Sequence, residues 1–248
     1  MAIVNQKGGV GKSTTAVNLG ASLAEMGYDV LLVDIDPQGN ATSGVGIDKS
    51  KLEYSIYDVL INDIKVEDVV LATEIDKFDI LPANIDLAGA EIELVSIISR
   101  EGKLKKAVSK LDEKYQYIIF DCPPSLGLLT LNALTAADGI LVPIQCEYYA
   151  LEGLGQLINT IKLVKNNLNP NLEIEGVLLT MYDARTNLSQ QVIEEVLNYF
   201  SDKVYKTIIP RNVRLSEAPS FGKPINLYDS SSKGAEAYRN LAKEVVNL

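Results

Sequence analysis

Short apolar runs alternate along the chain with longer segments of helical spacing. The apolar runs predict strands over residues 2–4, 30–33, 117–120, 139–142, 174–180 and 204–209. The helical spacing predicts helices over residues 13–26, 86–99, 103–111, 127–137, 151–166, 188–200 and 234–246. Because strands and helices alternate, the pattern predicts an α/β fold: a mostly parallel, twisted sheet with helices on both faces.

The chain shows no internal repeat, low-complexity tract or obvious linker. Residues 41–75 are its least regular part, and we expect them to form an excursion from the sheet. Since 248 residues fall within the range of one large domain, residues 1–248 are predicted to form a single domain.

The composition excludes several classes of enzyme. No histidine is present, which excludes serine–histidine and cysteine–histidine hydrolases and histidine-ligated zinc enzymes. Two cysteines, Cys122 and Cys146, are too few for a disulfide framework or a four-cysteine zinc site. No apolar run approaches the ~20 residues that a membrane span needs. We therefore expect a cytoplasmic globular protein.

The net charge of −10 argues at first sight against a polyanionic partner. The charge is unevenly distributed, however: residues 1–140 hold 12 basic and 21 acidic side chains, whereas the rest of the chain holds 11 and 12. Four cations follow one another with no acidic residue between them: Lys203, Lys206, Arg211 and Arg214. This distribution is compatible with a basic face on an acidic protein.

A glycine-rich segment between the first predicted strand and helix favours a phosphate-binding loop. Its sequence is Lys7-Gly8-Gly9-Val10-Gly11-Lys12-Ser13-Thr14. Glycines let successive backbone N–H groups face an anion, and the start of the helix adds its dipole. Lys12 is predicted to reach the β- and γ-phosphates, and the Ser13 hydroxyl to ligate Mg²⁺. Gln6 stands where the strict P-loop pattern has its first glycine.

Acidic residues follow two of the predicted strands. Asp121 ends the run over residues 117–120, and Asp34 and Asp36 follow the run over residues 30–33. The carboxyl ends of parallel strands are where open α/β sheets bind ligands. A single aspartate there would by default be a cap or a turn residue, but P-loop enzymes hold Mg²⁺ with such an acid, usually through water. Asp121 is therefore a predicted magnesium residue.

The second lysine of the loop makes it resemble the deviant Walker A motif, K-G-G-x-G-K-[ST], of the ParA/MinD group of P-loop ATPases. The resemblance implies that Lys7 crosses a dimer interface to the nucleotide of the partner subunit, so that ATP holds a homodimer together. Residues 34–39 resemble the first switch of the group, D-x-D-P-Q-[GA], which implies that Asp36 positions or activates the attacking water and leaves Asp34 a structural role. Asp121 and the prolines after it resemble the second switch.

Over nearly its whole length the chain resembles the chromosomal ParA/Soj proteins of bacterial DNA partition, most specifically in residues 146–153 and 214–220. The resemblance implies that Pro210 and Asn212 contact the adenine base. It also implies that Arg185 and Arg214 bind double-stranded DNA without sequence preference, and only in the ATP dimer. A ParB-type partner would stimulate hydrolysis and release the protein from DNA. We accordingly expect a nucleoid-associated ATPase.

Two alternatives come from the same group. MinD-type positioning ATPases end in a basic amphipathic membrane helix, whereas the mixed charges of residues 235–248 favour a packed final helix. Metabolic ligases or reductases on this scaffold act on a second substrate or hold a cluster through cysteines. Cys122 and Cys146 fall in other motifs, which favours buried thiols over cluster ligands. Only five residues precede Gln6, which predicts either a short first strand or a true start that lies upstream.

Overall fold

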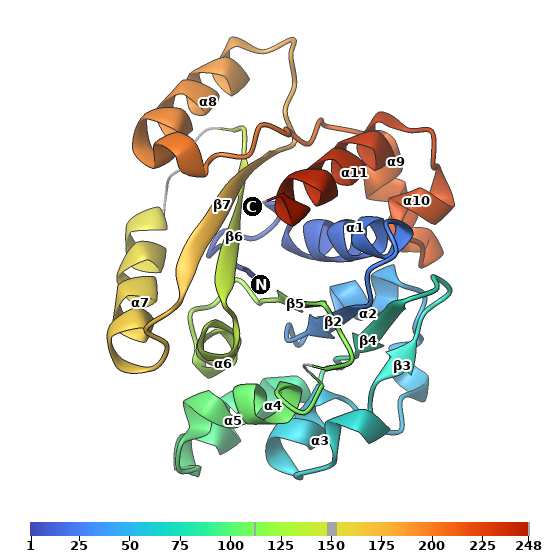
Figure 1. Cartoon of the computed structure of the whole chain (residues 1–248), viewed down its shortest axis with the longest axis vertical. Coiled ribbons are helices and arrows are strands. Elements are labelled where there is room, and N and C mark those ends of the chain that lie inside the picture. Colours follow the sequence, from blue (N-terminus) through green and yellow to red (C-terminus); the bar gives the residue numbers. More distant parts are fainter. Residues whose placement is uncertain (112, 148–152, 248) are drawn as a thin grey trace.

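The computed structural model describes residues 1–111, 113–147 and 153–247 (Figure 1). Within them, seven strands form one sheet in the order β3-β4-β2-β5-β1-β6-β7. The strands are β1 (Ala2–Ile3), β2 (Val30–Asp34), β3 (Leu71–Ala72), β4 (Phe78–Leu81), β5 (Tyr117–Asp121), β6 (Gly139–Gln145) and β7 (Glu173–Thr180). All neighbours are parallel except β3 and β4, which confirms the predicted α/β class.

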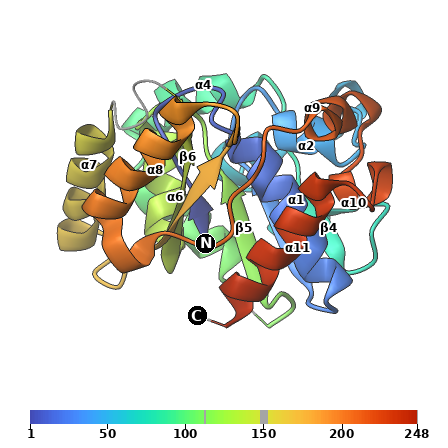
Figure 2. The same ribbon diagram turned by 90° about the horizontal axis from the view of Figure 1, so that it is seen from above.

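Helices cover both faces of the sheet (Figures 1 and 2). One core lies beneath α3 (Ile56–Ile61), α4 (Leu87–Glu93), α5 (Lys103–Val108), α6 (Leu128–Ala136), α7 (Leu154–Asn167) and α8 (Asn187–Phe200). The other lies beneath α1 (Lys12–Glu25), α2 (Asn40–Gly44), α9 (Val213–Glu217), α10 (Ile225–Tyr228) and α11 (Lys233–Val246).

The two cores explain why the central strands are continuously apolar. Along β2, Leu31 and Val33 enter one core, while Val30 and Leu32 enter the other. Side chains alternate between the faces of a strand, so a strand buried on both faces needs an apolar residue at every position. All five residues of β2 are buried, including Asp34 at its end.

The expected excursion from the sheet is confirmed for residues 41–70, which form most of α2 and all of α3. Leu71–Ala72 return to the sheet as β3, which pairs antiparallel with β4. The pattern did not predict β4 because Asp79 interrupts a short apolar run. In the structure, the Asp79 carboxylate accepts hydrogen bonds from the Tyr115 hydroxyl (2.5 Å) and the Lys114 ammonium (3.1 Å). These partners let an acidic residue occupy a strand beside β2.

The predicted strand over residues 204–209 is wrong. The segment runs beside β7, and the backbone N–H groups of Tyr205 and Ile209 donate to it. Between them, the N–H of Thr207 donates to the carboxylate of Glu244 on α11 instead (2.8 Å). That bond interrupts the ladder, and among the described residues isolated bridges remain between Val204 and Val177 of β7 and between Pro210 and Tyr182.

Several helix ends also differ from the prediction. The helix expected over residues 86–99 is α helical only to Glu93 and continues as a 3-10 turn. The helix expected over residues 103–111 ends at Val108. The helix expected from residue 151 begins at Leu154; residues 148–152, part of the motif at 146–153, lie outside the described chain.

The final helix is packed, as predicted. Tyr238, Leu241 and Val245 of α11 are buried in the core that α11 shares with α1, and the Tyr238 hydroxyl is hydrogen bonded to Thr15 (3.2 Å). Both cysteines are buried, and β1 is short. Among the described helices, none has the length and apolar character to cross a membrane.

The packing of α1 on β4 predicts the effect of one methyl group. A Cβ at Gly20 would lie 2.6 Å from the buried ring of Phe78. Overpacking costs about 1–3 kcal/mol, which outweighs the helix propensity gained by alanine. Gly20→Ala should lower the free energy of unfolding in urea. Gly155→Ala on α7, where a Cβ meets nothing within 4 Å, should not; equal effects of the two changes would contradict this packing.

Candidate nucleotide-binding site

The loop between β1 and α1 has a backbone that only glycine adopts easily. Gly9 has φ 74° and Gly11 has φ 90°, both in the left-handed region. A Cβ at Gly8 or Gly9 would meet no atom within 4 Å, so the loop faces open space. α1 follows directly and has no acidic residue in its first turn, which leaves the positive end of its dipole uncompensated. The local sequence therefore builds an anion site.

A cavity of about 560 Å³ lies over this loop. Residues from the loop and from distant segments line it, including Gly8, Gly9, Gly11, Lys12, Ser13, Thr14, Asp36, Pro124, Met181 and Lys223. A second pocket of about 250 Å³ shares Gly11, Thr14, Met181 and Pro219 with it and is also lined by Pro210, Arg211 and Asn212. The fold thus brings the predicted phosphate residues, Asp36 and the predicted base contacts into two adjoining hollows.

Lys12 is a buried cation at the floor of the site. The residue is only 7% exposed, and its ammonium donates to the backbone oxygen of Lys7 (3.2 Å). Burial lowers the pKa of Lys12, while the charges of Asp121 and Asp36 act in the opposite direction. A bound phosphate would supply the anion that such a buried ammonium needs.

Asp121 is a fully buried carboxylate at the end of β5. Neither of its oxygens has a hydrogen bond of ordinary geometry to a described residue, although the Ser13 hydroxyl lies close enough to favour the charged form. Burial, and next the charge of Asp34, raise the pKa of Asp121 well above its usual value. Its two oxygens beside a hydroxyl fit a site for a hard cation.

This donor set suits magnesium. No cluster of three or more acidic or cysteine side chains that could hold a metal occurs among the described residues. Mg²⁺ does not need one, since it keeps several waters and binds one or two protein groups together with phosphate oxygens. Ser13 and Asp121 therefore suffice as protein partners for a nucleotide-bound ion.

Asp34 and Asp36 lie in different environments. The Asp34 carboxylate accepts hydrogen bonds from the N–H (2.8 Å) and hydroxyl (2.7 Å) of Thr42, and burial raises its pKa to about 6. It thereby fixes the turn after β2. Asp36 lines the cavity, where its Oδ1 accepts from the backbone N–H of Gln38 (2.9 Å). Of the two carboxylates, Asp36 is the one that faces the space that a nucleotide would fill.

The predicted DNA residues lie outside both hollows. Arg185 forms two hydrogen bonds to the Asp183 carboxylate (2.9 and 2.6 Å). Arg214 donates to Glu217 (3.0 Å) and lies 3.4 Å from a carboxylate oxygen of Asp229. Each arginine thus carries an internal counter-ion.

Among the residues of the cavity region that the sequence did not predict are Thr180, Met181 and Lys223. The Thr180 hydroxyl donates to the backbone oxygen of Val10 in the loop (2.9 Å), and Met181 lines both hollows with φ 53°. Both stand at the end of β7, where the strand-end rule points to them. Lys223 lines the larger cavity, and no motif around it signals that position.

The loop, the strand-end carboxylates and the cavity define a P-loop nucleotide-binding protein. Residues 1–174 match the protein family described as AAA domain. The chain is 67% identical to the sporulation initiation inhibitor protein Soj of Bacillus subtilis over 245 residues, which cover 99% of this chain and 97% of that protein. It is 58% identical to the chromosome partitioning protein ParA of Myxococcus xanthus, with 98% and 86% covered. The chain belongs to the ParA/Soj family of ATPases.

Solved structures share the fold. One, named as a cobyrinic acid a,c-diamide synthase of Mycobacterium smegmatis with bound ADP and magnesium, is 44% identical with a TM-score of 0.87; the match covers 99% of this chain and 93% of that one. The septum site-determining protein MinD of Pyrococcus horikoshii with Mg-ADP is 29% identical with a TM-score of 0.77, covering 98% and 94%. The nucleotides and magnesium in these relatives agree with the predicted ATP and Mg²⁺.

The buried carboxylates predict how stability depends on pH without nucleotide. Burial raises the pKa of Asp121 and of Asp34 above the unfolded value of 3.8, so the folded protein binds more protons than the unfolded chain. The stability these groups contribute is present below about pH 4 and is lost as pH rises through the raised pKa of each carboxyl, which is about 6 for Asp34.

Asp121→Asn removes one of these titrations. In urea unfolding without nucleotide or magnesium, we expect the fall in unfolding free energy between pH 5 and pH 8 to be smaller than in the wild type. The exposed Asp76→Asn is the matched control and should keep the wild-type slope. A wild-type slope in Asp121→Asn would contradict the described environment of this carboxylate.

Proposed function

We propose that residues 1–248 form one ATPase domain that hydrolyses ATP to ADP and phosphate with Mg²⁺ and acts as a switch of the ParA/Soj type. In the ATP state the protein is a homodimer that binds double-stranded DNA without sequence preference. A ParB-type partner stimulates hydrolysis and releases the protein, which drives segregation of a chromosome or plasmid. The observation that carries the proposal is the convergence of the loop, Asp36 and the Pro210–Asn212 segment on adjoining hollows.

The chain's own residues divide the work. The loop from Gly8 to Thr14 and the Lys12 ammonium bind the phosphates, and Pro210 and Asn212 contact the base. Ser13 and Asp121 hold the magnesium ion, which neutralises charge on the phosphate oxygens when bound. Asp36 orients the attacking water from the cavity wall. Positioning and neutralisation of charge are the main contributions that phosphoryl transfer needs from a protein.

The position of Lys7 supports a role across a dimer interface. Lys7 is half-buried at the start of the loop, but it does not line either hollow, whereas the next two glycines line the larger one. A position outside the cavity of its own subunit supports the proposed contact with the nucleotide of a second copy. The open space over Gly8 and Gly9 leaves room for that approach.

DNA binding by an acidic protein requires local cations and two copies. Arg185 and Arg214 are both exposed, and phosphates would replace the carboxylates that hold them. A few contacts per subunit give weak, salt-dependent binding, and dimerisation doubles the contacts. DNA binding therefore follows the nucleotide state, and we propose a cytoplasmic, nucleoid-associated location.

The observations support a MinD-like membrane ATPase and a metabolic enzyme less well than a partition ATPase. A MinD-like membrane helix would need a free apolar face, whereas the apolar side chains of α11 are buried against α1. A metabolic role is suggested by the name of the M. smegmatis relative, but the higher identity to Soj favours partition.

Three variants test the nucleotide switch. ATP affinity measures nucleotide binding, and size-exclusion chromatography measures dimerisation. Lys12→Ala should lose ATP binding, because it removes the buried ammonium. Lys7→Ala should bind ATP but remain a monomer. Asp36→Ala should bind ATP and accumulate as a stable dimer, because hydrolysis is blocked. ATP-driven pairing of the Lys7→Ala protein would contradict the proposed dimer contact, and tight ATP binding by Lys12→Ala would contradict the loop assignment.

DNA retardation with ATP, ADP or no nucleotide over a salt series tests the output. We expect binding with ATP alone, and we expect it to weaken steeply as salt rises. Arg185→Ala should lose binding while it still dimerises; Lys165→Ala, an exposed cation elsewhere, is the control. ATP-dependent binding to lipid vesicles without DNA binding would favour the MinD-like alternative, and turnover of a second small substrate would favour a metabolic enzyme.

A further inference from the structure

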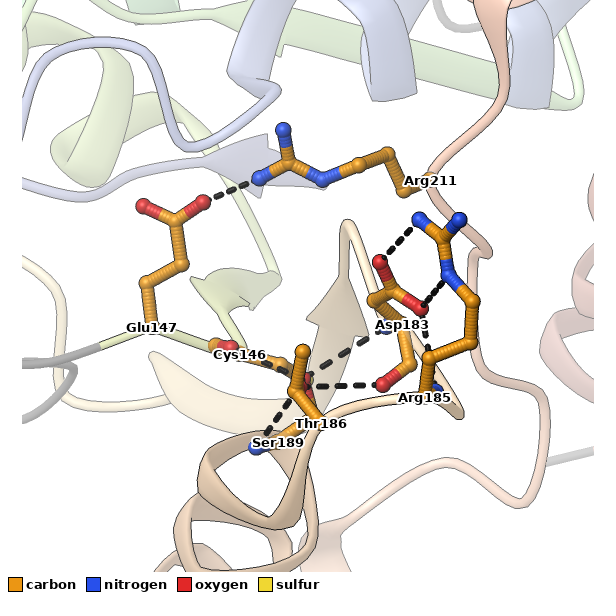
Figure 3. A network of polar contacts seen from close by, with 7 residues as sticks. All are labelled: Cys146, Glu147, Asp183, Arg185, Thr186, Ser189 and Arg211. Atoms are coloured by element: carbon orange, nitrogen blue, oxygen red, sulfur yellow. Dashed lines mark hydrogen bonds and ion pairs between the residues drawn. The ribbon is translucent and has the colours of Figure 1, made fainter.

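Two ion pairs lie next to each other beyond the ends of β6 and β7 (Figure 3). Arg185 pairs with Asp183 in the turn between β7 and α8. Arg211, from the segment that runs beside β7, reaches across to Glu147, which follows β6. The sequence-based DNA assignment includes Arg185 but not Arg211.

The first pair exposes its cation and shelters its anion. Arg185 donates to Asp183 through its Nε, one terminal nitrogen and its backbone N–H, the last at 3.0 Å. The Arg185 side chain is 85% exposed, while that of Asp183 is 19% exposed. The Asp183 carboxylate is therefore recessed, while the guanidinium of Arg185 is accessible to solvent. The planar guanidinium can bind a phosphate as well as it binds Asp183.

The second pair is fixed beside the first. The backbone N–H of Arg211 donates to the oxygen of Tyr182 (2.9 Å), which precedes Asp183. Hydrogen bonds from Arg185 lower the pKa of Asp183, and the charge of Arg211 adds a smaller contribution of the same sign. The Arg211 side chain is 54% exposed. Two guanidinium groups thus share one exposed surface.

Hydrogen bonds connect the backbone segments that carry the two ion pairs. Thr186 caps α8, with its hydroxyl accepting from the N–H of Ser189 (3.4 Å). The Ser189 hydroxyl donates to the backbone oxygen of Cys146 (3.2 Å), the residue before Glu147. Side chains on such a framework need little ordering when a ligand arrives.

We propose that Arg211 is a second DNA-phosphate contact beside Arg185, and that Glu147 and Asp183 are internal counter-ions that DNA phosphates displace. This inference rests on the DNA binding proposed above. In the exchange each arginine gives up a carboxylate and gains a phosphate oxygen, so neither guanidinium is left without an anion. Exchange of this kind gives modest affinity with no preference for sequence, because phosphates carry no sequence information.

Arg211 also lines the smaller hollow with Pro210 and Asn212. A change at Arg211 could therefore act on DNA through the nucleotide. Glu147 does not line either hollow, so its removal separates the two routes. Removal of a counter-ion predicts a gain of DNA binding, which damage to the nucleotide pocket does not.

The test measures DNA affinity with ATP over a salt series, together with ATP affinity and dimerisation. Glu147→Gln should strengthen DNA binding by about two- to fivefold per subunit, the range for an exposed ion pair. Arg211→Ala should weaken it and reduce the salt slope by about 0.9 for each phosphate that is no longer neutralised. Glu173→Gln, which removes the exposed partner of Lys165, is the matched control and should leave DNA affinity unchanged.

Each outcome decides one question. Glu147→Gln with unchanged or weaker DNA binding overturns the inference, as does Arg211→Ala with an unchanged salt slope. A wild-type protein that binds no DNA with ATP overturns the proposed function itself. Wild-type binding that both variants reproduce leaves the proposed function standing and removes only Arg211 and Glu147 from it.

Discussion

Burial of the central strands on both faces confines polar chemistry to their ends. β1, β2 and β5 lie side by side, with apolar side chains entering a core above and a core below. Parallel pairing brings their carboxyl ends to one edge, so the glycine loop, Asp36 and Asp121 become neighbours although they are far apart in sequence. The site is a consequence of strand order.

Ionisable side chains are buried at this edge of the sheet, where the carboxyl ends of the parallel strands meet. Lys12 and Asp121 are both buried, and the pKa of each shifts toward the neutral form. Such groups lower stability unless a ligand compensates them. A phosphate beside Lys12 and a cation beside Asp121 would each relieve one of these burial costs. Nucleotide binding at these side chains would therefore also stabilise the fold.

The sequence was informative where the chemistry is local. The loop from Lys7 to Thr14 and the acids that end two strands could be recognised because their neighbours in the chain determine their setting. Residues 204–209 were assigned wrongly because Glu244, on the last helix, takes the N–H that a strand would have used. β4 was missed because Asp79 depends on partners from another segment. On the surface, Arg185 pairs with a carboxylate only two residues away in the chain. Arg211 instead pairs with Glu147, 64 residues away, and this contact could not be predicted because it depends on β6 and β7 being neighbours in the sheet.

The hydroxyl of Thr180 connects the glycine loop of the nucleotide site to the strand that leads to the Arg185 turn. Thr180 ends β7 and holds the backbone oxygen of Val10, while the residues just after it lead into the turn that carries Arg185. A displacement of the glycine loop would therefore break this hydrogen bond or move the end of β7 with the loop. The Thr180 side chain thus connects the glycine loop, which lines the cavity, to the turn outside the cavity that carries Arg185.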